Sequence, residues 1–162
     1  MTRTLLVLLC LVLVVLVALA MRWGWRSRMR RQSVLPDLPI VPVDLGPATL
    51  TMDGLYVGST FADSWQDRVV HEGLGVRADA RATLYDGGVL IDRQGSSPIF
   101  LPAETWDGAR LAPGLAGKVM GAGGLFVVRW HLGESLIDTG MRGDDKSSYP
   151  AWVNAINGRV SA

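Results

Sequence analysis

The glycine-rich stretch from Gly114 to Gly124 is the part of the sequence that comes nearest to a phosphate-binding motif. A P-loop requires Gly, four residues, and then Gly-Lys followed by Ser or Thr, whose hydroxyl coordinates Mg²⁺. Here Gly117-Lys118 is followed by Val119, and Ala112 stands where the first glycine belongs. We therefore interpret the stretch as a loop that needs glycine backbone angles. A weaker interpretation is that Lys118 and exposed backbone amides bind an anion.

Residues that ligate metals or act as nucleophiles occur without the spacing that such sites need. His71-Glu72 has no second histidine four residues later, as a metalloprotease helix requires. With two histidines and one cysteine, Cys10, a zinc site would need several carboxylates. No serine occupies a Gly-x-Ser-x-Gly elbow, although a Ser-His-Asp triad assembled by the fold stays open as an alternative. The sequence predicts no enzymatic activity, no cofactor and no metal.

An apolar run near the N-terminus is the first element that must position the rest of the chain. From Leu5 to Met21, seventeen residues carry no charge and thirteen of them are Leu or Val. As a helix the run spans roughly 26 Å, close to the ~30 Å hydrocarbon core of a bilayer. Tryptophans at such a helix end favour the membrane interface. The sequence predicts a transmembrane anchor over residues 1–25, with the anchoring positions Leu5, Leu9, Leu13, Leu16, Trp23 and Trp25.

Basic residues directly after the run indicate the orientation of this anchor. They are Arg22, Arg26, Arg28, Arg30 and Arg31, against a single arginine before the run. Basic residues beside a membrane helix stay in the cytoplasm, so we expect the N-terminus outside and the C-terminal domain in the cytoplasm. The same arginines would attract anionic lipid headgroups.

A cleaved signal peptide is the alternative reading of the same segment. Ala18-Leu19-Ala20 has the small-x-small form of a cleavage site. We prefer an uncleaved anchor because the apolar run is longer than that of a signal peptide and the arginines follow it.

The remainder of the chain divides into a linker and one domain. Residues 26–44 are first basic and then rich in proline, which favours an extended spacer. Residues 45–162 carry ten Lys or Arg against thirteen Asp or Glu. A domain with this formal charge of −3 and no basic stripe lacks the electrostatic footprint of a nucleic-acid-binding protein, so we expect no nucleic acid as partner.

Turn residues divide the domain into short antiparallel strands. Asp53-Gly54, Asp86-Gly87-Gly88 and Gly133-Glu134 each separate two apolar or alternating segments, as hairpin turns do. The predicted strands cover residues 48–52, 55–59, 81–85, 89–93, 98–101, 125–132 and 135–139.

Two helices are expected in this domain. An apolar stripe at Trp65, Val69 and Val70 predicts the first, between residues 60 and 73. The second follows the acidic residues at 144–145 and begins around Pro150, which suits a first helical turn. Its buried face is predicted from i, i+3, i+4, i+7 spacing to consist of Tyr149, Trp152, Val153 and Ile156. A curved antiparallel sheet followed by one amphipathic helix suggests an α+β fold, a partly open barrel or sandwich closed by that helix.

This order of elements resembles the pleckstrin-homology-like (PH-like) superfold, and more narrowly the membrane-anchored PH-like domain proteins of actinobacteria. The segments that carry the resemblance are LYVGST at 55–60, GLGVR at 73–77, APGLAGKV at 112–119, GGLFVV at 123–128 and LIDTG at 136–140. The resemblance implies a fold and a membrane address, and it implies no established biochemical activity. It covers the anchor and nearly all of the domain.

These observations favour a membrane-tethered PH-like module that faces the cytoplasm. It would bind a protein partner or an anionic lipid headgroup, with Arg110 and Lys118 as candidate anion contacts. Tethering would raise the effective concentration of even a weak ligand at the membrane. The alternative is an exported, envelope-side membrane protein that serves cell-envelope transport or assembly. The sequence does not indicate an oligomeric state.

Overall fold

The computed structural model describes residues 2–32, 35–119, 121 and 123–161, and within the first helix it describes the side chains of residues 7–23. The chain forms two compact units, residues 1–35 and residues 36–162. The predicted domain boundary at residue 45 stays a prediction, while the second unit starts at Pro36. Its first residues lie along the domain as an extended segment in which Leu38, Pro39, Val41 and Leu45 are half-buried.

Helix α1 (Thr2–Gln32) makes up the first unit. Every Leu and Val from Val7 to Leu19 is more than half exposed, so apolar side chains surround the helix axis on all sides. Among the described residues, none of the helices combines the length and the hydropathy that a membrane span requires.

The predicted anchor and topology residues all belong to α1. Leu9, Leu13, Leu16, Arg22 and Trp23 are exposed on it. The side chains of Leu5, Trp25, Arg26, Arg28, Arg30 and Arg31 lie outside the described ones.

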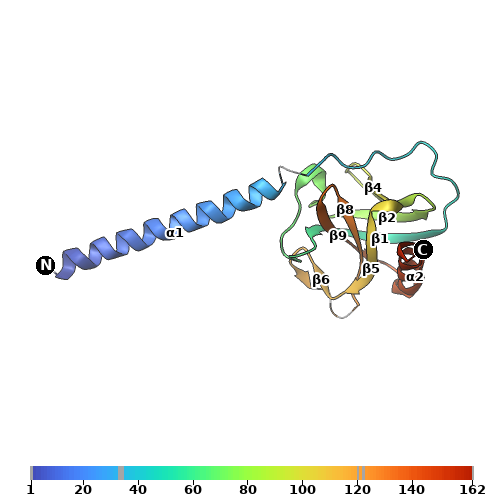
Figure 1. The fold of residues 1–162 in the computed structure, drawn as a ribbon. Coiled ribbons are helices and arrows are strands. Elements are labelled where there is room, and N and C mark those ends of the chain that lie inside the picture. The colour runs from blue at the N-terminus through green and yellow to red at the C-terminus, as the bar shows by residue number, and fades with distance from the viewer. Residues whose placement is uncertain (1, 33–34, 120, 122, 162) are drawn as a thin grey trace. The chain divides into compact units, whose positions relative to one another are not determined.

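A seven-stranded antiparallel sheet forms the frame of the second unit (Figure 1). Its strands are β1 (Leu50–Phe61), β2 (Ala78–Tyr85), β3 (Gly88–Arg93), β4 (Ile99–Pro102), β5 (Trp106–Ala112), β8 (Leu125–Leu132) and β9 (Ser135–Gly143). They lie in the order β4-β3-β2-β1-β9-β8-β5, with β4 and β5 at the two edges. In the described residues the sheet therefore stays open and does not close on itself as a barrel. The α+β class, the antiparallel sheet and the C-terminal helix are confirmed.

Two of the three predicted hairpins are confirmed by the strand register. Tyr85 pairs with Gly88 across the turn of β2 and β3, and Leu132 pairs with Ser135 across the turn of β8 and β9. The predicted turn at Asp53-Gly54 is wrong, because β1 runs through it while pairing with β2 and β9. A Cβ atom on Gly54 would lie on the backbone oxygen of Arg142, so this glycine permits close approach of two strands.

The helix predicted between residues 60 and 73 does not form. The loop after β1 instead directs its backbone hydrogen bonds to that strand: Val69 N–H donates to the oxygen of Ser59, and Ser59 N–H donates to the oxygen of Leu74 (both 2.9 Å). A short 3-10 helix, η1 (His71–Gly73), ends this loop. Trp65 and Val70 are exposed, at 44% and 64%, while Val69 between them is fully buried, so the three residues do not form one buried face.

Helix α2 (Tyr149–Val160) confirms the prediction for the C-terminus, with Pro150 in its first turn. Tyr149, Trp152 and Ile156 are buried as predicted, and Val153 is half-buried. Two of these aromatic rings pack against Phe126 of β8, with ring centroids 6.2 Å (Tyr149) and 5.6 Å (Trp152) away. The helix therefore closes one side of the core formed by the curved sheet.

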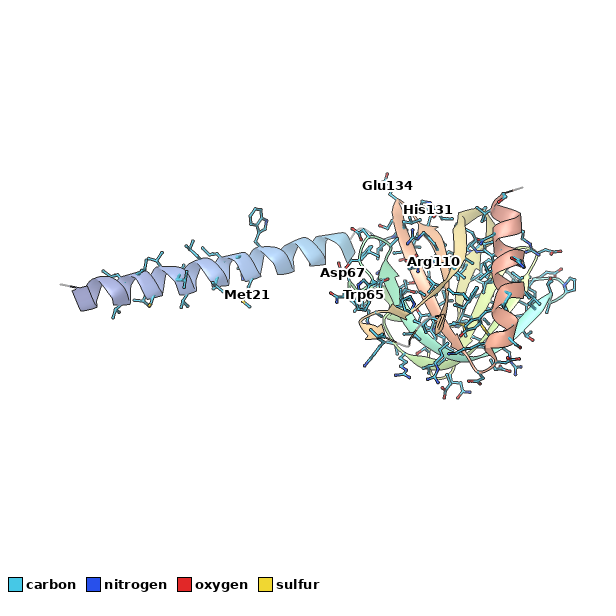
Figure 2. All side chains as sticks on the ribbon, turned by 90° about the horizontal axis from the view of Figure 1, so that it is seen from below. Met21, Trp65, Asp67, Arg110, His131 and Glu134 are labelled. Carbon is cyan, nitrogen blue, oxygen red and sulfur yellow. The ribbon has the colours of Figure 1, made fainter. Side chains whose placement is uncertain are left out.

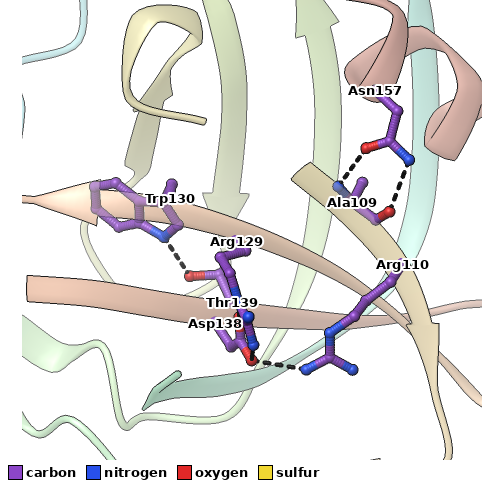
Figure 3. Close-up of polar contacts among 7 residues, drawn as sticks. All are labelled: Ala109, Arg110, Arg129, Trp130, Asp138, Thr139 and Asn157. Atoms are coloured by element: carbon purple, nitrogen blue, oxygen red, sulfur yellow. Dashed lines mark hydrogen bonds and ion pairs between the residues drawn. The ribbon is translucent and has the colours of Figure 1, made fainter. Parts of the chain in front are cut away.

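Asn157 of α2 forms hydrogen bonds with backbone groups at the open edge of β5. Its side-chain oxygen accepts the N–H of Ala109 at 2.7 Å, and its amide nitrogen donates to the oxygen of Ala109 at 3.0 Å (Figure 3). These two bonds imitate those of a neighbouring strand, and unpaired edge groups are what favours pairing with another chain. The helix therefore shields the edge of β5 at Ala109.

A small second hairpin, β6 (Gly114–Leu115) and β7 (Lys118–Val119), follows β5. Its buried member Leu115 belongs to a hydrophobic cluster with Val57, Ala112, Leu125 and Val127. Leu115 also lies directly over Gly140 of β9, where a Cβ atom would come within 2.5 Å of Leu115 Cδ2. The hairpin thus folds back over one face of the sheet.

Candidate functional site

A buried carboxylate with two arginines is the most strongly charged arrangement on that face of the sheet. Asp138 of β9 has a side chain that is only 3% exposed. Arg129 of β8 donates to it twice, from Nε to Oδ1 at 2.7 Å and from Nη2 to Oδ2 at 2.9 Å. Arg110 of β5 donates from Nη2 to Oδ2 at 2.7 Å (Figure 3). We call Arg110 and Arg129 the arginine pair.

The strand register explains why these three side chains meet. Arg129 lies directly opposite Asp138, so the two side chains share one face of the sheet. Arg110 lies opposite Val127, which is two residues from Arg129 and therefore on that same face. In the strand order β9 is followed by β8 and then by β5, and adjacent strands lie about 4.8 Å apart. One guanidinium group from β8 and one from β5 therefore reach the carboxylate of Asp138 on β9.

The hydrogen bond between Arg129 and Asp138 favours the charged form of the arginine, whereas burial opposes it. The hydrogen bond to Asp138 is the main cause that raises the pKa of Arg129, and Asp107 adds a smaller electrostatic contribution in the same direction. The carboxylate of Asp138 is removed from water and needs both cations, because an unpaired buried charge costs several kcal/mol. The arginine pair with Asp138 carries a formal charge of +1.

Arg110 retains hydrogen-bonding capacity toward solvent. Its side chain is 45% exposed, compared with 31% for Arg129. Among the described residues, its Nε and Nη1 groups donate to no acceptor, since only Nη2 is engaged by Asp138. Arg110 and the exposed His131 are both labelled in Figure 2. His131 lies two residues beyond Arg129 on β8 and hence on the same face of the sheet.

Lys118, the second predicted anion contact, lies on the hairpin that covers part of this face. Asp138 and Gly140 are two residues apart on β9, so Leu115 of the hairpin packs on the face that carries the arginine pair. Lys118 is exposed and pairs in register with Leu115. Arg68 ties the hairpin to the preceding loop by donating to the backbone oxygens of Gly75 (2.7 Å) and Ala116 (3.0 Å).

Sequence reasoning named Arg110 and Lys118 but missed Arg129 and Asp138. The predicted two-residue turn at 133–134 already contained the missing signal, because it places residue 132 opposite 135 and therefore 129 opposite 138. Two opposite charges at a cross-strand position form a pair. Only the contribution of Arg110 from β5 needed the tertiary structure, since no strand was predicted between residues 102 and 124.

A hollow of about 500 Å³ lies over β1, β2 and β3 instead, away from the predicted residues. Acidic side chains dominate its lining: Asp53, Asp79, Asp92 and Asp144 against Arg81 and Arg93. Asp53 is engaged by Arg81 at 2.6 Å, which lowers the pKa of its carboxyl group. An anion would be repelled by this lining, so the hollow does not complete the arginine site.

One group of side chains in the described part of the chain has the donor set of a metal site. Asp37, His71 and Glu72 each offer one ligand atom, and these atoms lie within 4.8 Å of one another. Asp37 is separated from the other two by more than thirty residues, so sequence spacing gave no signal for this group.

Comparison with known proteins gives a family and a fold. The family described as bacterial PH domain-like matches residues 35–157. A chain of the 8S snRNP assembly intermediate aligns with a TM-score of 0.50 and 8% identity, over 76% of this chain and 89% of that one. A chain of Vav1, inhibited by an allosteric inhibitor, aligns with a TM-score of 0.42 and 16% identity, over 88% of this chain and 34% of that one. No curated protein sequence matches. The first structural similarity concerns the fold alone.

Proposed function

Since this chain belongs to the bacterial PH-like domain family, we propose that it is a membrane-tethered binding module whose arginine pair holds the phosphate of an anionic lipid headgroup. Domains of this type are binding modules, and the described part of the chain holds no arrangement that we interpret as catalytic. The observation that carries the proposal is the shared, buried carboxylate of Asp138, which orients two partly exposed guanidinium groups.

Preorientation is what makes the pair suitable for a phosphate. A guanidinium group presents its N–H donors in a planar fork that matches phosphate oxygens. Binding is weakened when long side chains must first be immobilised, and here Asp138 has already immobilised both. Lys118 on the neighbouring hairpin adds a third positive charge to the same face.

Membrane attachment through α1 is the second part of the proposal. It rests on the uncharged run from Leu5 to Met21 and on the arginines that follow it. The charge asymmetry favours a cytoplasmic domain. A tether would keep the domain at the bilayer surface, where a weak headgroup contact gains effective concentration.

Liposome binding by the full chain tests the ligand. The chain is embedded in neutral nanodiscs, and its co-flotation with added anionic or neutral liposomes is measured. We expect binding to the anionic liposomes alone. Arg110→Gln should weaken it roughly tenfold, because a charge-assisted hydrogen bond contributes about 1.5 kcal/mol or more.

The matched control is Arg81→Gln, which breaks an exposed ion pair with Asp53 on strands β1 and β2. Its binding should equal that of the unsubstituted chain. Equal losses in both variants would show general charge attraction and would contradict the proposed site. Binding that ignores liposome charge would favour a protein partner over a lipid.

A reporter fused to the C-terminus tests the orientation. A cytoplasmic domain predicts an inactive alkaline phosphatase fusion, because that enzyme folds only after export. An active fusion would instead support the exported, envelope-side alternative. Mass measurement of the intact chain from membranes distinguishes an uncleaved anchor from a chain cut after Ala20.

A further inference from the structure

Three metal-binding side chains converge where the second compact unit begins. Asp37 comes from the extended segment that starts this unit, and His71 and Glu72 come from η1 after β1. One ligand atom from each lies within 4.8 Å of the others. Asp37 and Glu72 are exposed and His71 is half-buried, so a cation from solvent can reach all three.

The ring of His71 is already oriented for such a role. Its Nε2 atom lies 3.2 Å from the backbone oxygen of Pro36. A carbonyl oxygen can only accept, so Nε2 carries the hydrogen, and in the neutral ring Nδ1 is the atom that can bind a metal. Metal-ligating histidines commonly donate their other ring N–H to a backbone carbonyl, which sets the tautomer and the orientation of the ring.

A second hydrogen bond holds the two carboxylates side by side. The N–H of Leu38 donates to Oε2 of Glu72 at 2.9 Å, and Leu38 directly follows Asp37. Oε1 of Glu72 is left over for a further ligand. Among the described ion pairs, none joins Asp37 or Glu72 to a Lys or Arg, so two negative charges stand close together without a cation to offset them.

We propose that Asp37, His71 and Glu72 bind a borderline divalent metal ion, with Zn²⁺ as the best fit, which fastens the segment after Pro36 to the loop between β1 and β2. One imidazole and two carboxylates match Zn²⁺ better than Mg²⁺ or Ca²⁺, which prefer oxygen ligands alone. Ligand atoms on one tetrahedral Zn²⁺ lie ~3.4 Å apart. The exposed side chains reach that spacing by small rotations, and water completes the coordination.

Direct titration of the metal tests the site. The full chain without a polyhistidine tag is stripped with a chelator in detergent micelles, and Zn²⁺ or Mg²⁺ is added in a calorimeter. We expect saturable binding of one Zn²⁺ per chain and none of Mg²⁺. His71→Ala and Asp37→Asn should each weaken Zn²⁺ binding at least tenfold.

His131→Ala is the matched control, because this histidine is exposed on β8 and belongs to no such group among the residues that the structure describes. This variant should bind Zn²⁺ as the unsubstituted chain does. The thermal midpoint gives a second readout: Zn²⁺ should raise it in the unsubstituted chain and in His131→Ala, and leave it unchanged in His71→Ala.

The absence of saturable Zn²⁺ binding would overturn the proposal, and so would equal binding by His71→Ala and the unsubstituted chain. Loss of binding in His131→Ala alone would place the metal elsewhere and would overturn it as well. Neither readout involves lipid, so failure here is separate from failure of the arginine site.

Discussion

Four buried side chains form a hydrogen-bonded chain through the core whose direction can be derived from its ends. Trp130 Nε1 can only donate, and it donates to Oγ1 of Thr139 at 2.9 Å (Figure 3). At the other end, Tyr56 donates its single hydrogen to the backbone oxygen of Leu74 at 2.6 Å. Between these ends, the hydroxyl oxygen of Ser59 lies 2.8 Å from that of Thr139 and 2.8 Å from that of Tyr56. Thr139 must therefore donate to Ser59, and Ser59 to Tyr56.

Thr139→Val removes the central hydroxyl group of these hydrogen bonds while the shape of the side chain hardly changes. The indole N–H of Trp130, which is 0% exposed, then has no acceptor, and a buried unsatisfied donor costs about 1–3 kcal/mol. Ser59 loses the donor to its oxygen but keeps its bond to Tyr56, so the second loss is smaller. We expect the free energy of unfolding to fall by about 2–4 kcal/mol in total.

Urea unfolding of the full chain in micelles, followed by tryptophan fluorescence, measures this loss. Thr83→Val is the control, because Thr83 is nearly as buried, at 9% exposure, and its hydroxyl makes no hydrogen bond within the described residues. That control should change the unfolding free energy by less than about 0.5 kcal/mol.

The double variant Ser59→Ala with Thr139→Val separates a connected chain from independent bonds. Connected residues show a coupling of about 0.5–3 kcal/mol, whereas independent ones add. Equal stabilities of Thr139→Val and Thr83→Val, or strict additivity in the double variant, would refute the directed chain.

Two further predictions concern the same core and its edge. Burial raises the pKa of Tyr56 to about 12 from its ordinary 10.0, so the folded state holds this proton more tightly than the unfolded state. The stabilisation from the bound proton is present below pH 10 and is lost as the pH rises toward 12. Alkaline urea unfolding should show this loss in the unsubstituted chain and a smaller one in Tyr56→Phe, and equal slopes would contradict the assignment. Asn157→Ala should lower the unfolding free energy by about 1–2 kcal/mol, since it leaves both backbone groups of Ala109 unpaired. It should also promote aggregation by light scattering because the edge of β5 is opened, whereas Asn154→Ala, on the exposed face of the same helix, should do neither.

Local patterns in the sequence were sufficient for the hairpins and the last helix. Asp86-Gly87-Gly88 supplies the backbone freedom of a tight turn, and β2 and β3 pair on either side of it. The spacing of Tyr149, Trp152 and Ile156 is a property of the helix itself, and these residues are the buried ones. Both features depend on contacts between residues close in sequence, which is why they could be predicted.

The mistaken elements share a different cause. Asp53-Gly54 has the composition of a turn, yet β1 stays extended because β2 and β9 pair with it on both sides. The stripe at Trp65, Val69 and Val70 has helical spacing, yet the loop's backbone groups bond to β1. In both places long-range pairing overrides local preference, and a single sequence does not show which strand will be the neighbour.

The sequence by itself determined the apolar N-terminal helix with its arginines, the antiparallel strand content and the amphipathic C-terminal helix. Each follows from the composition or the periodicity of neighbouring residues, so no knowledge of the fold was required. Only the tertiary structure decided the order of the strands in the sheet, that Arg110 joins Arg129 on one buried carboxylate, and that Asp37 meets His71 and Glu72. Those groups are brought together by strand order and by a segment that lies along the domain, and contacts between residues distant in sequence leave no periodic signal.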